Sequence, residues 1–126
     1  IVSYDLLLTT FWYNIDPYVS DRQFCDRGRQ YRPEIFVHTA DQRDQANASV
    51  KAIKKRSLLK GSFMVPISKA GTFYPAEKYH QDYYLKNPRH YKRYRQGCGR
   101  DQRLQVIWGF SKDGKSLQKA DSLRKK

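Results

Sequence analysis

The start of the chain carries the pattern of an amphipathic helix that begins after Ser3. The Ser3 hydroxyl can cap the first turn, and Asp5 places a negative charge where the helix dipole favours one. The pattern ends at Asp16–Pro17, because the residue before a proline avoids helical geometry. Apolar residues recur at helical spacing along one face, namely Leu8, Phe11, Trp12 and Ile15.

A strand, a second helix and another strand are predicted next. Residues 34–38 form a short strand pattern, and a helix follows over about 41–59 with its lysines on a solvated face. Gly61 fits the C-terminal cap of that helix, and 63–65 predicts a strand that ends near Pro66. The inner stripe of the helix consists of Ala46, Val50, Ile53 and Ser57.

Two more helices are predicted in the second half of the chain. Pro75 suits the first position of a helix with Glu77 in its first turn, which runs to about Leu85 and stops before Asn87–Pro88. A short last helix opens at Asp101. Its apolar side consists of Leu104, Ile107 and Trp108, and Gly109 closes it.

The remaining stretches complete the predicted organisation. Residues 18–33 are polar and charged and predict a long loop of the kind that often carries function. Residues 111–126 predict a basic, disordered tail after a single domain over 1–110. Helices mixed with few strands predict an α+β fold. Because two strands are too few for a stable sheet, we expect an upstream segment or a partner to complete it.

Composition narrows the class of protein. Hydrophobic residues make up 39% and aromatic residues 14%, so the chain should fold as one domain with a modest core. No apolar run is long enough to span a bilayer, and the start lacks the regions of a signal peptide. The first residue is Ile1, so the true N-terminus is expected elsewhere. A cytoplasmic location is the default expectation.

Charge and cysteine content add chemical limits. A net charge of +13 invites acidic partners, although basic residues spread along the whole chain favour a solubilising bias. Cys25 and Cys98 are too few for a disulfide framework or a cysteine-rich zinc site. His38, His80 and His90 show no ligand spacing, so no metal site is expected. A redox-active cysteine pair stays open.

Four stretches in order along the chain carry a family resemblance. They are residues 3–17 (SYDLLLTTFWYNIDP), 21–33 (DRQFCDRGRQYRP), 70–84 (AGTFYPAEKYHQDYY) and 98–104 (CGRDQRL), the last followed by Trp108–Gly109. Together they resemble the peptide methionine sulfoxide reductase A family, and their ordered combination is highly specific. The family's fold implies a two-layer α/β sandwich with a ferredoxin-like core, incomplete here at the N-terminus.

The resemblance implies reduction of methionine S-sulfoxide, free or in oxidised proteins, by thiol chemistry. In the family a cysteine thiolate attacks the sulfoxide sulfur and becomes a sulfenic acid. A second cysteine resolves it as a disulfide, which thioredoxin or another dithiol reduces, so no cofactor is needed. The family's glycine–cysteine–phenylalanine–tryptophan and glycine–histidine–alanine–glutamate motifs do not occur in this sequence. We expect them, and one oxygen-binding tyrosine, upstream of Ile1.

The resemblance assigns roles to residues that are present. Tyr31 would donate its phenol hydrogen to the sulfoxide oxygen, and Asp26 would order water and polar groups around it. Cys98, between two glycines, suits a mobile resolving thiol. Cys25 is a poor replacement for the nucleophile, because Asp26 beside it disfavours thiolate. A second group is expected to wall the pocket or to pack a helix on the sheet: Glu77, His80, Tyr83 and Tyr84.

Three functions compete. The first is an enzyme, monomeric if complete, whose N-terminal part is supplied from elsewhere. The second is a truncated, inactive relative. The third is a nucleic-acid-binding module, because 79–95 interleaves tyrosines with lysines and arginines. The family resemblance explains most of that stretch, so nucleic-acid binding ranks last.

Overall fold

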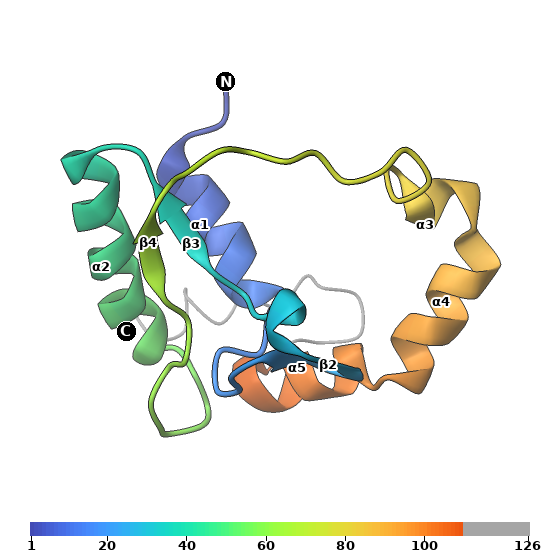
Figure 1. Ribbon diagram of the computed structural model, residues 1–126. Helices are drawn as coiled ribbons and strands as arrows, with labels where there is room; N and C mark the ends of the chain where they lie inside the picture. The colour runs from blue at the N-terminus through green and yellow to red at the C-terminus, as the bar shows by residue number, and fades with distance from the viewer. Residues whose placement is uncertain (110–126) are drawn as a thin grey trace.

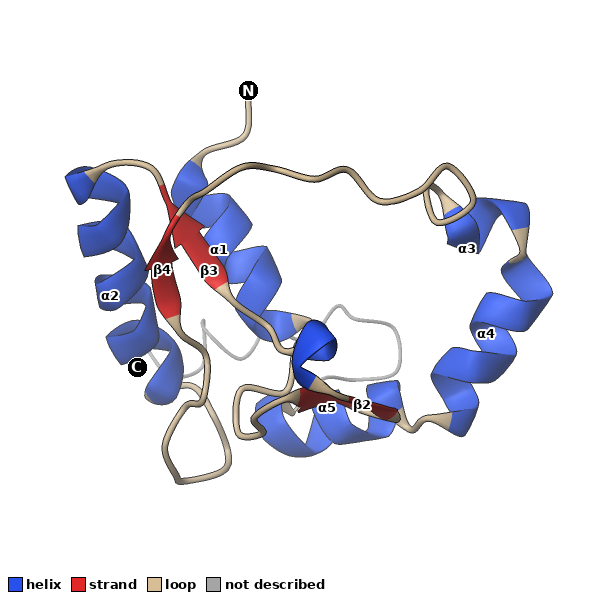
Figure 2. Cartoon of the chain, viewed as in Figure 1, coloured by secondary structure: helices blue, strands red, loops and turns tan. Residues whose placement is uncertain are grey.

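The computed structural model describes residues 1–109 and shows a mixed α+β protein that is mostly helical with small sheets (Figures 1 and 2). The α+β prediction is therefore confirmed. The predicted tail, 111–126, lies outside the described residues. In chain order the elements are α1 (Tyr4–Tyr13), β1 (Arg22–Gln23), β2 (Asp26–Arg27), the 3-10 turn η1 (Arg29–Tyr31), β3 (Ile35–Val37), α2 (Ala40–Lys54), β4 (Ile67–Lys69), α3 (Tyr83–Lys86), α4 (Pro88–Gly97) and α5 (Arg100–Trp108).

The hydrophobic core lies where α1, α2, β3 and α5 meet. Trp12 is 1% exposed, and its indole nitrogen donates to the Ser49 hydroxyl at 2.8 Å, which joins α1 to α2. Ile107 on α5 is fully buried. The apolar stripes predicted for the first, second and last helices supply most of this core. Its buried members are Leu8, Trp12, Tyr13, Ile35, Val37, Ala46, Ile53, Leu104, Ile107 and Trp108.

Two small sheets accompany the helices. β3 and β4 pair in parallel, with Ile35 opposite Ile67, and α2 is the crossover that a parallel pair requires. β1 and β2 pair antiparallel, with Gln23 opposite Asp26. The segment 18–33, predicted as one long loop, therefore contains a short ladder and a 3-10 turn.

The first two predicted helices begin as expected and end early. The Ser3 hydroxyl accepts from the Leu6 N–H, which confirms that cap, but α1 stops at Tyr13 rather than at Asp16–Pro17. α2 stops at Lys54 rather than Leu59, and Gly61 does not cap it. The chain leaves α2 because the Tyr18 hydroxyl binds Ser57 at 2.6 Å and the Leu59 carbonyl at 2.7 Å. These contacts place residues 57–59 beside Tyr18.

The predicted strand over 63–65 is displaced to β4. The Ile35 N–H donates to the Pro66 carbonyl at 3.0 Å, so the β3–β4 ladder begins directly after Pro66. Proline lacks a donor but keeps its carbonyl, which allows it to open a strand. Phe63 instead packs its ring on Trp12, with centroids 5.4 Å apart.

The predicted helix from Pro75 to Leu85 is wrong. Only α3 is helical there, because Asp82 adopts a left-handed φ of 53° that interrupts the helix. α4 begins with Pro88 at its first turn, and the sequence patterns did not predict it. Proline at that position costs no hydrogen bond. Residues 71–97, called the arm below, thus consist of an extended segment followed by α3 and α4.

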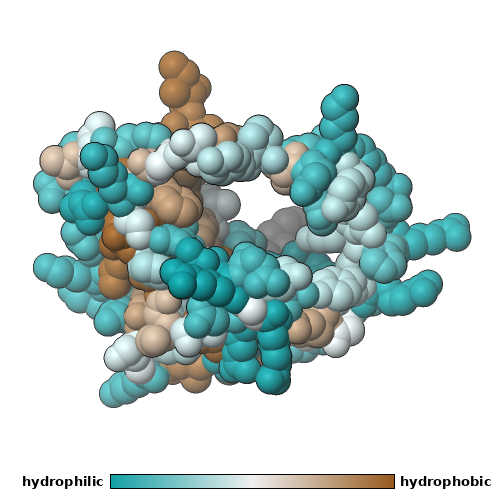
Figure 3. Space-filling model, viewed as in Figure 1, coloured by the Kyte–Doolittle hydropathy of each residue, from teal (hydrophilic) through white to brown (hydrophobic). Residues whose placement is uncertain are grey.

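The arm stands away from the core. Figure 1 shows it arching from β4 to the far side of the molecule and returning at α5. On the face in Figure 3 hydrophobic residues gather beside α1, β3 and β4, whereas the arm is largely hydrophilic, and a hollow separates the two. Among the described residues no helix is long and apolar enough to cross a membrane.

Candidate functional site

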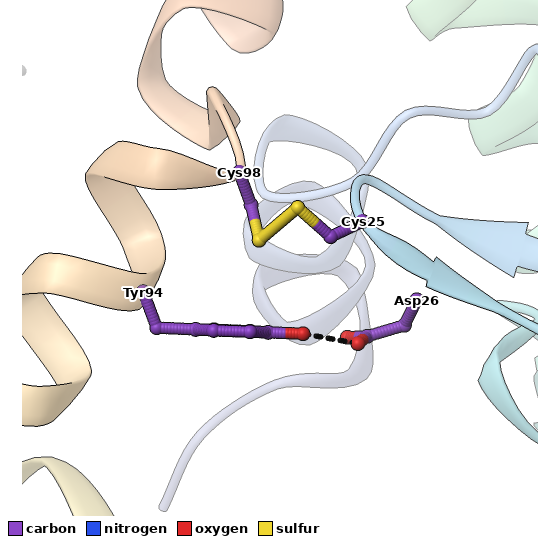
Figure 4. The surroundings of a disulfide bond; sticks show 4 residues. All are labelled: Cys25, Asp26, Tyr94 and Cys98. Carbon is purple, nitrogen blue, oxygen red and sulfur yellow. Dashed lines mark hydrogen bonds between the residues drawn. A yellow bond between two sulfur atoms is a disulfide. The ribbon is translucent and has the colours of Figure 1, made fainter.

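A disulfide joins the two ends of the site. Cys25 lies in the turn between β1 and β2, and Cys98 caps the end of α4; their Cα atoms are 5.2 Å apart across a sequence separation of 73. Figure 4 shows the bond spanning these two segments. Gly99, at a left-handed φ of 66°, then turns the chain into α5. The sequence left a redox-active pair open, and the structure pairs these two cysteines.

A buried residue, Asp16, holds the two segments next to the cysteines, one through its main chain and one through its carboxylate. Asp16 is 5% exposed, and its Oδ2 accepts from the Arg103 Nε on α5 at 2.7 Å. The Gln23 side chain, on β1 just before Cys25, accepts from the Asp16 N–H at 3.1 Å and donates to its carbonyl at 2.8 Å. Asp16 therefore ties β1 and α5 to the end of α1. From the sequence alone, Asp16 was predicted only as the end of the first helix.

Asp26 lies beside the disulfide and has a partner that the sequence did not predict. The Tyr94 hydroxyl, on α4, donates a short hydrogen bond to Asp26 Oδ1 (Figure 4). This hydrogen bond raises the pKa of Tyr94, with smaller contributions from burial and from the charges of Asp26 and Tyr31.

A cavity of about 520 Å³ opens over the disulfide. Four predicted site residues, Cys98, Asp26, His80 and Tyr83, contribute to its lining. The other three, Tyr31, Glu77 and Tyr84, do not. Its lining residues are mostly aromatic, imidazole or cationic: Phe24, Cys25, Asp26, Tyr79, His80, Tyr83, His90, Tyr91, Tyr94, Arg95, Cys98 and Arg100.

The predicted pocket residues hold their places through aromatic contacts within the arm. The Tyr83 hydroxyl lies 2.7 Å from His90 Nδ1, and His90 stacks on the Tyr94 ring. The His80 imidazole lies against the Tyr79 ring and 3.9 Å from the Glu77 carboxylate, an exposed pair. Tyr31 lies in η1 and is 44% exposed.

Two arginines supply fixed positive charge near the sulfurs. The Arg100 guanidinium lies 4.2 Å from the centre of the Phe24 ring and donates to the Asn14 carbonyl at 3.0 Å. Burial, and then the charge of Arg95, lower the pKa of Arg100. Hydrogen bonding to Asp101 is the main reason that the pKa of Arg95 is raised. Both stay charged at neutral pH, and nearby cations favour a thiolate when such a disulfide opens.

Within residues 1–109 no group of three or more histidine, cysteine or acidic side chains is arranged to hold a metal ion. The chemistry of the site lies in its sulfurs, its phenols and its carboxylate. A disulfide flanked by cations can exchange with an external thiol, and phenol hydroxyls can donate to an oxygen that gains charge. Fold and site therefore define an α+β protein with a cysteine pair under an aromatic, cationic cavity.

The comparisons identify the family. The family model described as peptide methionine sulfoxide reductase matches residues 1–112, and the chain belongs to this family. A peptide methionine sulfoxide reductase MsrA of Bacillus licheniformis is 44% identical over 113 residues, which is 90% of this chain and 62% of the relative. The Bacillus subtilis protein of the same name is 43% identical over 86% of this chain and 62% of its own length.

A third relative, peptide methionine sulfoxide reductase MsrA 2 of Caulobacter vibrioides, is 46% identical over 86% of this chain and 54% of its own length. The chain thus spans about six tenths or less of the curated relatives that it matches. The family resemblance stated from the sequence is confirmed. The roles of the individual site residues stay predictions.

Proposed function

We propose that this chain provides the sulfoxide-oxygen-binding and thiol-recycling part of a peptide-methionine (S)-S-oxide reductase. The observation that carries the proposal is the position of Cys98, the predicted resolving residue. It lies in a disulfide with Cys25 directly beside Asp26, in a chain of the matching family. Its substrates are free methionine S-sulfoxide and oxidised proteins, and its reductant is thioredoxin or another dithiol.

The proposed reaction divides between three thiols. An attacking thiol, of the family's glycine–cysteine–phenylalanine–tryptophan motif, takes the sulfoxide oxygen, which leaves methionine and a sulfenic acid. The Cys98 thiol attacks that sulfenic sulfur, and its proton leaves with the sulfenic hydroxyl as water while a disulfide forms. The Cys25 thiolate then attacks Cys98 Sγ, which frees the first thiol and forms the disulfide seen here. An external dithiol reduces Cys25–Cys98 and is itself oxidised.

The other residues stabilise charge in this scheme. Tyr31 donates its hydroxyl hydrogen to the sulfoxide oxygen as charge develops there, and Asp26 orders the polar groups around that oxygen. Arg95 and Arg100 line the same cavity and favour the thiolate form of the cysteine pair. His80 and Tyr83 contribute to the wall on the side of the arm, and Glu77 pairs with His80 beside it.

The same proposal extends to the fold and the domain limits. Residues 1–110 form the reductase-like unit, with the family's two-layer α/β sandwich and ferredoxin-like core. The parallel β3–β4 pair with α2 as its crossover supports this arrangement, because parallel strands occur where helices cover the sheet.

A turnover experiment tests the proposal. The segment of the Bacillus licheniformis relative that precedes the aligned region is fused to residue 1, and N-acetyl-methionine (S)-S-oxide is supplied with excess dithiothreitol. We expect the fusion to form N-acetyl-methionine, and we expect the R epimer to be left unreduced. Tyr31→Phe should lower turnover by about 100-fold, since it removes one oxyanion donor.

Two outcomes would contradict these assignments. Turnover by the fusion that is unaffected by Tyr31→Phe would remove that residue from the oxygen site. Turnover by the unfused chain that is abolished by Cys25→Ser or Cys98→Ser would make that cysteine the nucleophile. A matched control is Tyr84→Phe, which removes a phenol hydroxyl from the exposed arm and should leave turnover unchanged.

A further inference from the structure

Two links run side by side between the β1–β2 turn and the end of α4. The covalent link is Cys25–Cys98, and the polar link is the hydrogen bond from Tyr94 to Asp26. Cys25 and Asp26 are neighbours in the chain, and the Cys98 N–H donates to the Tyr94 carbonyl at 2.9 Å, one helical turn back. Figure 4 shows both links on the same side of α4.

The covalent link explains how the polar link survives in water. The Tyr94 side chain is 48% exposed, and a hydrogen bond at an exposed position competes with solvent. A tether that holds donor and acceptor together raises their effective concentration and offsets that competition. The disulfide is such a tether, because it fixes the last turn of α4 against the residue that precedes Asp26.

Gly99, which follows Cys98, allows α4 to move away from the β1–β2 turn when the disulfide opens. Gly99 occupies a left-handed backbone conformation between Cys98 and α5. Beyond it, Arg100 is held by Phe24 and the Asn14 carbonyl, and Arg103 by Asp16. α5 therefore stays on the core if the disulfide opens. α4 is joined to α5 across Gly99 by the solvent-exposed Arg95–Asp101 ion pair, a weak restraint that allows α4 to swing there. Tyr94 would move with α4, and Asp26 would stay with β2.

We propose that Tyr94 is a positioning residue that occupies Asp26 while the Cys25–Cys98 disulfide is intact and releases it when the disulfide is reduced. A phenol has one hydrogen to donate, so Tyr94 bound to Asp26 cannot serve the oxygen of a substrate. One carboxylate oxygen of Asp26 in turn is already occupied as a hydrogen-bond acceptor. The consequence for sulfoxide binding rests on the proposed function: the oxidised chain binds sulfoxide weakly and the reduced chain binds it well.

The release consumes a dithiol. One of its thiolates attacks a sulfur of the Cys25–Cys98 bond, which breaks as a mixed disulfide forms, and its second thiol then displaces the protein sulfur. The chain gains two electrons and two protons as two thiols, and the dithiol becomes a disulfide. In a reaction cycle this order keeps the next sulfoxide away until the Cys25–Cys98 pair, which recycles the attacking thiol, has been reduced.

Tyrosine NMR on the full 126-residue chain tests the link directly. Tyrosine labelled with carbon-13 at Cζ is titrated with alkali in the oxidised and dithiothreitol-reduced forms, and Tyr94→Phe assigns its signal. The groups that influence this phenol in the oxidised form are Asp26, Tyr31 and the stacked His90. We expect the Tyr94 midpoint to be above about 10 when oxidised and to fall toward that value on reduction.

Two variants test whether the Tyr94 midpoint reports its hydrogen bond to Asp26. Asp26→Asn should lower the Tyr94 midpoint in the oxidised form to that of the reduced form, while the disulfide stays intact. Tyr84→Phe, on the same arm, should leave both Tyr94 midpoints unchanged. A Tyr94 midpoint that is the same in the oxidised and reduced wild-type chains would overturn the proposal.

A binding titration with N-acetyl-methionine (S)-S-oxide measures the consequence. Reduction, or Cys25→Ser with Cys98→Ser, should tighten binding about three- to ten-fold, the worth of one hydrogen bond to a charged group. Oxidised Tyr94→Phe should bind more tightly than the oxidised wild-type chain, because Asp26 is free in it, and less tightly than the reduced chain, which also has the Tyr94 hydroxyl to donate. If the Tyr94 midpoint shifts on reduction but no form binds the sulfoxide, the link stands and the proposed sulfoxide site is wrong.

Discussion

The core and the arm are stabilised by different interactions. In the core, Trp12 and Ile107 are at most 1% exposed, and aromatic rings of α1 and α5 pack edge to face. In the arm, all of which the structure describes, no residue from 71 to 97 is buried, and only Tyr83 and Arg95 are half-buried. Three of its tyrosines, Tyr83, Tyr91 and Tyr94, have their hydroxyls in polar contacts.

This difference decides what can move each region. Burial of apolar surface stabilises the core regardless of redox state and changes little with pH. The arm depends on one disulfide, a phenol–carboxylate hydrogen bond and ion pairs, all of which chemistry can switch. The cavity lies between the two regions, so its shape depends on the region that is easier to change.

Two ion pairs allow the comparison to be tested with matched variants. Asp16 is buried under Arg103, whereas Asp101 is 57% exposed beside Arg95. We expect Asp16→Ala to lower the free energy of unfolding by about 3 kcal/mol, because it leaves the partly buried Arg103 guanidinium and the Tyr18 N–H without their carboxylate partner. Asp101→Ala should cost less than about 1 kcal/mol.

Urea unfolding followed by tryptophan fluorescence measures both variants, since Trp12 and Trp108 are buried in the core. Equal losses would mean that the end of the arm is as firmly built as the core. The Asp16 variant carries a second readout, the equilibrium of Cys25–Cys98 with glutathione. A looser α5 should make the disulfide easier to reduce.

Cutting the disulfide should have an effect of similar size that is centred on the arm. Its loss should cost about 2–4 kcal/mol if the unfolded chain gains the freedom of a closed loop, and part of this loss should appear as local opening. The arm offers trypsin several exposed sites, including Lys86, Lys92 and Arg93. We expect reduction to speed cleavage there and to leave Lys51 and Lys54 on α2 protected.

Mass spectrometry of early tryptic fragments, with and without dithiothreitol, measures this difference. Cys25→Ser should reproduce the reduced pattern without any reductant. Cleavage that speeds up equally on α2 and on the arm would show that the disulfide stabilises the whole molecule and not one region.

Sequence reasoning succeeded where hydrophobic periodicity reflects burial. Leu8 and Trp12, Ala46 and Ile53, and Leu104 with Ile107 all lie in the core as their spacing predicted. It failed in the arm, where Pro75–Leu85 has a helical spacing of aromatics but no surface to pack on. There a left-handed Asp82 and the proline at 88 decide where helices begin.

The residues of the site also divide into those that the sequence predicted and those that it did not. The family motifs pointed to Asp26 and Cys98, and both line the cavity. Tyr94 and Asp16 were missed, because each gains its meaning from a partner far away in the chain: Tyr94 from Asp26, and Asp16 from Arg103. Local patterns cannot reveal such pairs.

The smallest expected effect is the response of the two regions to alkali. Two tyrosines have a raised pKa: Tyr4 in α1, through burial, and Tyr94 in the arm, chiefly through its hydrogen bond to Asp26. A pKa that is higher in the folded than in the unfolded chain means that the neutral phenol is favoured by folding. Each contribution is therefore complete below pH 10 and is lost as pH rises through the folded pKa.

What is lost differs between the regions. Ionised Tyr4 can no longer donate to the Phe36 carbonyl, now 2.9 Å away, and α1 loosens on β3. Ionised Tyr94 faces the Asp26 carboxylate as a second anion, so the end of the arm is repelled while the disulfide still holds it. Hydrogen exchange at pH 9 and pH 11, corrected for the intrinsic rate, should show faster opening of both segments at the higher pH. Tyr94→Phe should abolish the change in α4 alone, and Tyr4→Phe the change in α1 alone. An α4 response that persists in Tyr94→Phe would mean that another group, and not this phenol, makes the arm sensitive to alkali.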